Sequence, residues 1–162
     1  MNNFIKRTIS GVGFAAVMLA AFLTNKFIFG AVMLFALIVM MWEFLRMTCG
    51  KEYKYSQILS ILAGTTLFTL VWLFKGFNFP GRLVILAFVP VFILMINSLY
   101  VKDKSRFNKF ANLYTAIIYI AVPWSVINFA AFGPEGEFNG MLLLSFFAII
   151  WGSDVGAYLF GI

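Results

Sequence analysis

The sequence contains no histidine, one cysteine and few charged residues. Without histidine it lacks the side chain that most often moves protons near neutral pH. Cys49 has no second cysteine to pair with, and a lone cysteine in an apolar segment usually packs as a small hydrophobic residue. Charged residues make up 11% of the chain, whereas soluble domains carry about 25%. The chain therefore has too few charges to cover a folded surface in water.

Hydrophobic residues make up 63% of the 162 positions and gather in six long stretches. None of the stretches shows the two-residue alternation of a β-barrel strand. Because about 20 apolar residues cross the hydrocarbon core as a helix, each stretch predicts one membrane span. The predicted spans are 9–24, which can extend back to Phe4, 27–47, 56–74, 83–100, 110–132 and 141–162. We therefore expect an all-α polytopic membrane protein with about six transmembrane helices, in a single transmembrane domain covering residues 1–162.

The first apolar stretch has two interpretations. Lys6 and Arg7 followed by an apolar run resemble the start of a signal peptide. However, no clear pair of small residues marks a cleavage site after Leu23, and the next apolar run begins at Phe27. These features favour a tight helical hairpin that turns at Thr24-Asn25-Lys26.

The distribution of basic residues predicts the orientation in the membrane. If the N-terminus is cytoplasmic, the inner segments hold nine lysines and arginines and the outer segments hold three. Cytoplasmic loops usually carry the excess, so both termini are expected in the cytoplasm and the protein in the inner (cytoplasmic) membrane of the cell. The inner set is Lys6, Arg7, Arg46, Lys51, Lys54, Lys102, Lys104, Arg106 and Lys109; the outer set is Lys26, Lys75 and Arg82.

The net charge of +6 does not indicate a nucleic-acid partner. The basic residues stand in short clusters between apolar runs, without interleaved aromatic residues. Clusters of this kind face anionic lipid headgroups. The clusters Lys6-Arg7 and 102–109 either bind lipid phosphate or only set the topology. The sequence has no P-loop, no Cys/His metal cluster and no nucleophile–base pair.

Asp154 is the only carboxylate in the last apolar stretch. It lies 13 residues after Met141, which is about 20 Å along a helix. An ionised carboxylate at the membrane centre costs about 2.5–3.5 kcal/mol on insertion scales, so such residues usually have a function and a partner. The alternative is that the helix ends earlier and Asp154 lies at the membrane surface.

Small residues surround Asp154. Gly152 and Gly156 are four residues apart and would lie on one face of a helix. Without side chains they leave room for another helix, a ligand or an ion. Beside the Ser153 hydroxyl, the Asp154 carboxylate suits a hard cation such as Mg²⁺. Ordinary helix packing is the alternative explanation for the glycines.

Glu43 is a second carboxylate in an apolar stretch. Arg46 follows it by three residues, so the two side chains would be neighbours on a helix surface. We expect an ion pair between them at the cytoplasmic end of the second helix. Pro90 and Pro123 lie within apolar stretches and are expected to kink them.

The segment from Trp151 to Gly161 resembles the Asp-x-Gly-Ala-Tyr-x-x-Gly stretch of phosphatidate cytidylyltransferases, the CDP-diacylglycerol synthases. The matching residues are Asp154, Gly156, Ala157, Tyr158 and Gly161. Segments 6–11, 42–44 and 120–123 resemble that family's basic start, second-helix ending and Pro-containing fifth span. The resemblance therefore covers the whole chain, and the Asp154 motif is its most specific part.

The resemblance implies a nucleotidyltransferase of phospholipid biosynthesis, which joins CTP and phosphatidic acid into CDP-diacylglycerol and pyrophosphate using Mg²⁺. Such a transfer depends on positioning and charge neutralisation, so it needs no histidine. Asp154 is the expected catalytic and metal-binding residue. The expected substrate-binding residues are Ser153, Gly156, Tyr158, Lys6 and Arg7. Membrane lipids are further expected partners, and a homodimer is expected.

The sequence departs from the family at its end. Family members continue well beyond this motif, with a Ser-Pro-Lys-Lys-Thr-like stretch and a further acidic and basic signature, whereas this sequence stops at Ile162. We therefore expect the N-terminal part of a longer enzyme, inactive by itself. The alternatives are a small ion- or proton-coupled transporter that uses Asp154, and a non-catalytic membrane scaffold. A transporter would be favoured by a second carboxylate on a facing helix, which the sequence does not offer.

Overall fold

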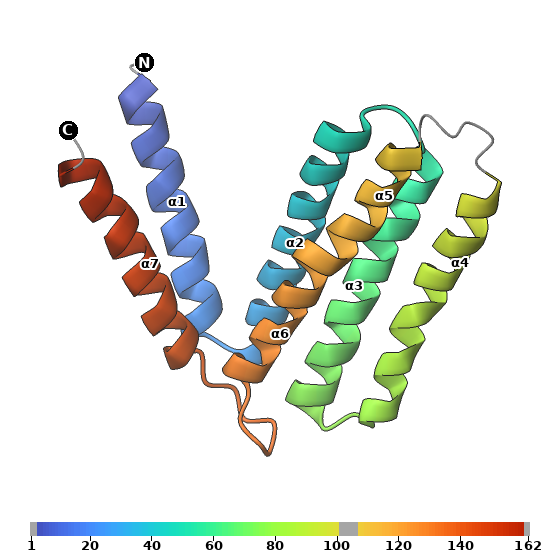
Figure 1. Ribbon diagram of the computed structural model, residues 1–162. Coiled ribbons are helices and arrows are strands. Elements are labelled where there is room, and N and C mark those ends of the chain that lie inside the picture. Colours follow the sequence, from blue (N-terminus) through green and yellow to red (C-terminus); the bar gives the residue numbers. More distant parts are fainter. Residues whose placement is uncertain (1–2, 101–106, 161–162) are drawn as a thin grey trace.

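The computed structural model of the chain describes residues 3–100 and 107–160, and within them the chain is helical, with a single isolated β-bridge and no strand. Figure 1 shows the order of the elements along the chain. The elements are α1 (Asn3–Leu23), α2 (Lys26–Cys49), α3 (Lys54–Phe77), the 3₁₀ segment η1 (Gly81–Ala87), α4 (Phe88–Leu99), α5 (Phe107–Thr115), the π-helical segment η3 (Ala116–Ala121), α6 (Val122–Ala131) and α7 (Met141–Phe160). The all-α prediction is confirmed.

Four helical segments are long and apolar enough to cross a membrane. They are Lys26–Cys49, Lys54–Phe77, Gly81–Leu99 and Phe110–Ala131, and each coincides with a predicted span to within a few residues. The apolar parts Gly11–Leu23 of α1 and Met141–Ala157 of α7 are shorter. A membrane protein is therefore supported by four spans, and crossing by α1 and α7 stays a prediction.

The turn between α1 and α2 is closed by Asn25. Its side-chain oxygen accepts hydrogen bonds from the backbone N–H groups of Phe27 and Ile28, each at 3.0 Å. A side chain at this N-cap position satisfies donors that the first helical turn leaves without partners. The expected break between the helices at Thr24-Asn25-Lys26 is confirmed, but α1 and α2 diverge from this turn and do not form a tight hairpin (Figure 1).

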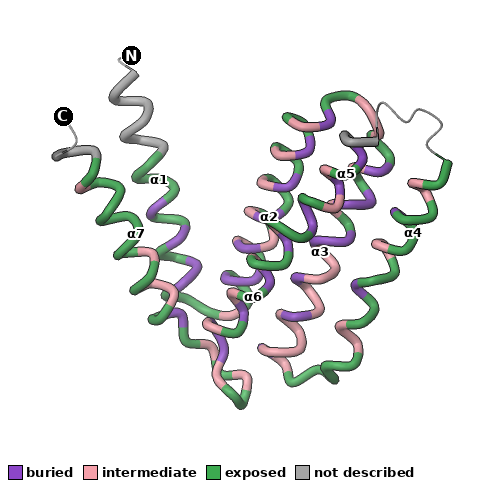
Figure 2. The backbone as a smooth tube through the Cα atoms, viewed as in Figure 1, coloured by how far each residue is buried: buried purple, intermediate pink, exposed green. Residues whose placement is uncertain are grey.

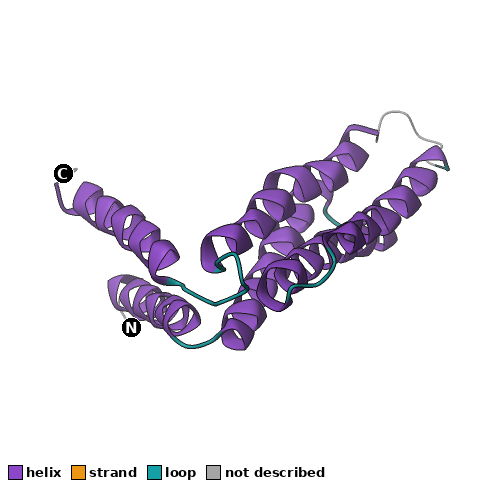
Figure 3. Ribbon diagram, turned by 90° about the horizontal axis from the view of Figure 1, so that it is seen from below, coloured by secondary structure: helices purple, strands orange, loops and turns teal. Residues whose placement is uncertain are grey.

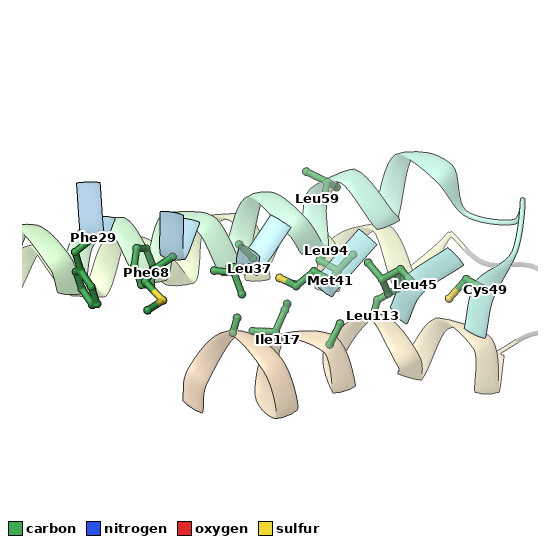
Figure 4. Packing of buried hydrophobic residues seen from close by; sticks show 14 of the residues in the cluster. Phe29, Leu37, Met41, Leu45, Cys49, Leu59, Phe68, Leu94, Leu113 and Ile117 are labelled. Carbon is green, nitrogen blue, oxygen red and sulfur yellow. The ribbon is translucent and has the colours of Figure 1, made fainter. Parts of the chain in front are cut away.

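The core of the bundle follows one side of α2. Residues at every fourth position of this helix are at most 2% exposed, and Figure 4 shows them packed against α3 and the α5–η3 segment. These residues are Phe29, Met33, Leu37, Met41, Leu45 and Cys49. Gly64 of α3 lets the elements approach, because a methyl group there would overlap Met41 and lie 2.9 Å from Cβ of Ala121.

Polar side chains connect the packed helices. The Ser60 hydroxyl of α3 donates to the carbonyl of Leu113 in α5 at 2.8 Å. The indole of Trp124 in α6 donates to the carbonyl of Met33 in α2 at 2.8 Å. Hydrogen bonds between helices in lipid contribute about 0.6 kcal/mol on average. They act here mainly to set the register between neighbouring helices.

Both prolines lie where a helix changes its winding. Pro90 is in the first turn of α4, directly after the 3₁₀ segment η1, and Pro123 follows the π segment η3. Proline has no N–H and its ring crowds the preceding turn, so the regular hydrogen-bond ladder must adjust there. Figure 1 shows that η1 continues into α4, and that α5, η3 and α6 form one continuous helical segment.

Helices α1 and α7 form a separate pair. Figures 1 and 3 show them side by side and diverging from the bundle of α2–α6, with both chain ends at the same end of the molecule. The ring of Phe147 in α7 lies 6.2 Å from that of Phe14 and 5.9 Å from that of Phe22. These aromatic contacts hold α7 against α1.

Candidate functional site

Asp154 lies within helix α7. The helix starts after Asn139, whose side-chain oxygen accepts a hydrogen bond from the backbone N–H of Met141 at 3.0 Å. It then continues without interruption to Phe160, six residues beyond Asp154. The alternative that the helix ends before Asp154 is therefore wrong. Because the run from Met141 to Ala157 is apolar, the carboxylate stands on a hydrophobic helix.

The surroundings of Asp154 are open. Gly152, Ser153 and Asp154 are all exposed, and Figure 2 shows the same for much of α7. A methyl group added at Gly152 or Gly156 would meet no atom within 4 Å. Within the described residues these glycines therefore do not serve helix packing, and the face that they form is available to a ligand or a partner.

The pairing of α1 with α7 brings the basic start of the chain to the level of Asp154. Phe14 and Phe147 are in contact. Arg7 precedes Phe14 by seven residues and Asp154 follows Phe147 by seven, so both lie about 10 Å further along these antiparallel helices. Lys6 and Arg7 thus share one end of the pair with Asp154. A carboxylate and two cations at one level suit a ligand that carries phosphate and a metal ion.

A model described as the cytidylyltransferase family matches residues 5–162 of the chain. The chain belongs to the cytidylyltransferase family. It is therefore a CTP-using nucleotidyltransferase associated with the membrane. Searches of curated proteins and of solved structures gave no match.

The oxygen atoms of Asp154 and Ser153 could supply some of the ligands of a magnesium ion. Mg²⁺ takes oxygen ligands and is often held by one or two carboxylates together with substrate phosphates. Asp154 and Ser153 offer such oxygens on the exposed part of α7. Within the part of the chain that the structure describes, no three Asp, Glu, His or Cys side chains gather into a metal site. These residues therefore fit an ion held mainly by substrate phosphates, with Asp154 as one carboxylate ligand.

Three of the expected substrate-binding residues are described only by their backbone. Lys6 and Arg7 belong to α1 and Tyr158 to α7, and their side chains lie outside the described residues. Ser153 and Gly156 lie beside Asp154 on α7, with Ser153 exposed and Gly156 half-buried. Most of the basic cluster 102–109 lies outside the described residues as well.

The expected ion pair between Glu43 and Arg46 is absent from the described structure. Glu43 is exposed, and the guanidinium of Arg46 lies over the ring of Trp42, 5.2 Å from its centroid. A guanidinium can stack on an indole as well as pair with a carboxylate, and an exposed ion pair gains little. The aromatic contact therefore replaces the predicted pair.

Two features near η3 and α6 were not predicted from the sequence. A cavity of about 380 Å³ opens between α3, α4, η3 and α6 and is lined almost wholly by apolar side chains, with Ser125 as a polar exception. Nearby, Asn128 is fully buried and its side-chain oxygen has no hydrogen-bond partner within the described residues. Pro123 marks this region in the sequence, but a proline alone does not predict a cavity.

Proposed function

We propose that the protein is a phosphatidate cytidylyltransferase, which makes CDP-diacylglycerol and pyrophosphate from CTP and phosphatidic acid. The observation that carries the proposal is the exposed Asp154, in its Asp-x-Gly-Ala-Tyr-x-x-Gly motif, on an apolar helix of a cytidylyltransferase. A lipid substrate suits this position, because its acyl chains can stay in the bilayer while its phosphate reaches the helix end. A soluble substrate would have no need for a site on such a helix.

The reaction joins two groups of like charge. A phosphate oxygen of phosphatidic acid bonds to the α-phosphorus of CTP, while the bond to the β-phosphate oxygen breaks and pyrophosphate leaves. A bound Mg²⁺ would neutralise part of the phosphate charge, with Asp154 as its ligand. Lys6 and Arg7 would attract the phosphate of the lipid substrate from the facing helix. Ser153 would donate a hydrogen bond, Gly156 would leave space, and Tyr158 would contact the nucleotide.

The location follows from the substrates. CTP is made in the cytoplasm, and the loop charges predict that the end of α7 with Asp154 faces it. We therefore place the protein in the inner (cytoplasmic) membrane. The open face at Gly152 and Gly156 also leaves room for a second copy of the chain, in keeping with the expected homodimer.

A transporter that uses Asp154 is the less favoured function. Coupling an ion to transport calls for a partner group that faces the carboxylate inside the protein. Asp154 is exposed, and among the described residues it belongs to no group of three acidic or cysteine side chains that could bind an ion inside the protein. The chain also belongs to a family that uses CTP, and a transporter that couples an ion to transport would not need CTP.

The test supplies labelled CTP and Mg²⁺ to membranes that contain the natural protein, with phosphatidic acid or with diacylglycerol as the added lipid. Phosphatidic acid should give labelled CDP-diacylglycerol and an equal amount of pyrophosphate. Diacylglycerol, which lacks the phosphate, should give no labelled nucleotide–lipid. The proposal is overturned if cytidylyl transfer proceeds to another acceptor and phosphatidic acid stays unreacted.

A further inference from the structure

A second cavity, of about 310 Å³, lies between the end of α2 and the start of α3. Arg46, Lys51 and Lys54 line it together with Gln57. The lining residues include no carboxylate. Among residues 3–100 and 107–160, none of these three cations forms an ion pair. Three cations in a lining without a carboxylate create a positive potential that suits an anion.

The turn between α2 and α3, which carries Lys51 and leads into Lys54, is stabilised by side-chain hydrogen bonds. Helix α2 ends at Gly50, whose positive φ of 61° lets the chain reverse direction. The Gln57 side chain donates to the carbonyls of Gly50 at 3.2 Å and Glu52 at 2.6 Å. Gln57 thus fixes the turn from α3, and Lys51 and Lys54 extend from a defined backbone.

The residues that line the cavity change from basic to apolar along the two helices. Lys54 starts α3, whereas Ile58 and Ile61, which also line the cavity, lie one and two turns further along the helix. On α2, Trp42 lies two turns before Gly50, and its ring packs under the Arg46 guanidinium at 5.2 Å. Cations near the α2–α3 turn, followed along the helices by isoleucine and indole groups, match a molecule with a charged head and an apolar tail.

We propose that this cavity binds an anionic phospholipid, with its phosphate between Arg46, Lys51 and Lys54 and an acyl chain along Trp42, Ile58 and Ile61. A free phosphate would share the charge interaction but gain nothing from the apolar side chains that line the cavity. Basic pockets between transmembrane helices on the cytoplasmic side commonly hold lipid headgroups. The site is on α2 and α3, apart from Asp154 on α7, and does not depend on the proposed reaction (Figure 1).

The test measures lipid binding to the purified chain in detergent by native mass spectrometry. The double variant Lys51→Gln/Lys54→Gln removes two cations from the cavity. The matched control Lys75→Gln/Arg82→Gln removes the same charge from the far end of α3 and from the start of η1. Each cation near a bilayer surface contributes about fivefold to the binding of an anionic lipid. The cavity variant should therefore bind phosphatidylglycerol about 25-fold more weakly. The control variant should bind it about as well as the unchanged chain.

Two further arms identify the ligand. Phosphatidylcholine, which has no net charge, should bind equally to all three proteins, and millimolar inorganic phosphate or CTP should not displace phosphatidylglycerol. If both variants lose phosphatidylglycerol binding equally, the proposed site is wrong, because binding would then depend only on the overall charge of the protein. Displacement by inorganic phosphate or CTP would overturn the lipid assignment in favour of a free-phosphate site.

Discussion

Helices α2 and α7 are both long and apolar, yet they are packed in opposite ways. Six residues of α2, at every fourth position from Phe29 to Cys49, are buried among the other helices. No residue of 141–157 in α7 is buried, and most of its large apolar side chains are exposed, as in Ile149 at 68%. Figure 2 shows this contrast between α2 and α7.

The difference in packing between α2 and α7 leads us to propose that stability and function depend on different helices. The motif residues from Asp154 to Tyr158 lie on the loosely packed α7, whereas none of the six buried positions of α2 belongs to a segment that resembles the family. A face that must admit a nucleotide, a lipid or a partner cannot also be filled by neighbouring side chains. We therefore propose that the bundle of α2–α6 is the scaffold and that α7 presents the proposed site beside it. The predictions below test this division, from the largest expected effect on the protein to the smallest.

The largest expected effect is a thiol-labelling result that is either complete or absent. It tests whether α1 and α7 cross the membrane. In a Cys49→Ser background, single cysteines at Asn3, Lys51 and Glu135 are labelled from outside with an impermeant thiol reagent. Six spans predict that only the Glu135 position is labelled. If α1 does not cross, the Asn3 and Glu135 positions will lie on the same side, and the pair will not be a membrane-spanning unit.

The second effect compares truncation of an apolar side chain in each region. Leu37→Ala leaves a cavity among fully buried neighbours and should lower the free energy of unfolding by about 2 kcal/mol or more. Ile149→Ala removes an exposed side chain and should cost less than about 0.5 kcal/mol. Unfolding curves in one detergent measure both. Equal losses would show that α7 is packed as firmly as α2.

The third and smallest effect adds a methyl group in each region. Gly64→Ala places it against Met41 and Ala121 and should cost about 1–3 kcal/mol. Gly152→Ala meets open space and should instead stabilise the helix by up to about 1 kcal/mol. The same unfolding assay reads both variants. A marked loss of stability at Gly152 would reveal a neighbour that covers the motif face.

The sequence predicted the helical elements well, because apolar runs bounded by Asn25 and by polar turns leave few other structures in lipid. Asp154 could also be singled out, since a lone carboxylate in an apolar run is rare. The stacking of Arg46 on Trp42 could not be predicted, because Glu43 and Trp42 are equally close to Arg46 along the helix. The weak packing of α7 could not be predicted either, because the hydropathy of a sequence does not distinguish a lipid-facing helix from a buried one.

The most direct test of the account is Asp154→Asn in the natural protein, measured by formation of CDP-diacylglycerol at several Mg²⁺ concentrations and by thermal unfolding. Asparagine keeps the size of the side chain and removes its charge. Because charge neutralisation drives this kind of transfer, the rate should fall by about two orders of magnitude or more. Since Asp154 is exposed and holds no buried contact, the unfolding temperature should stay unchanged. A well-folded Asp154→Asn protein with near-normal activity would contradict the central role of Asp154.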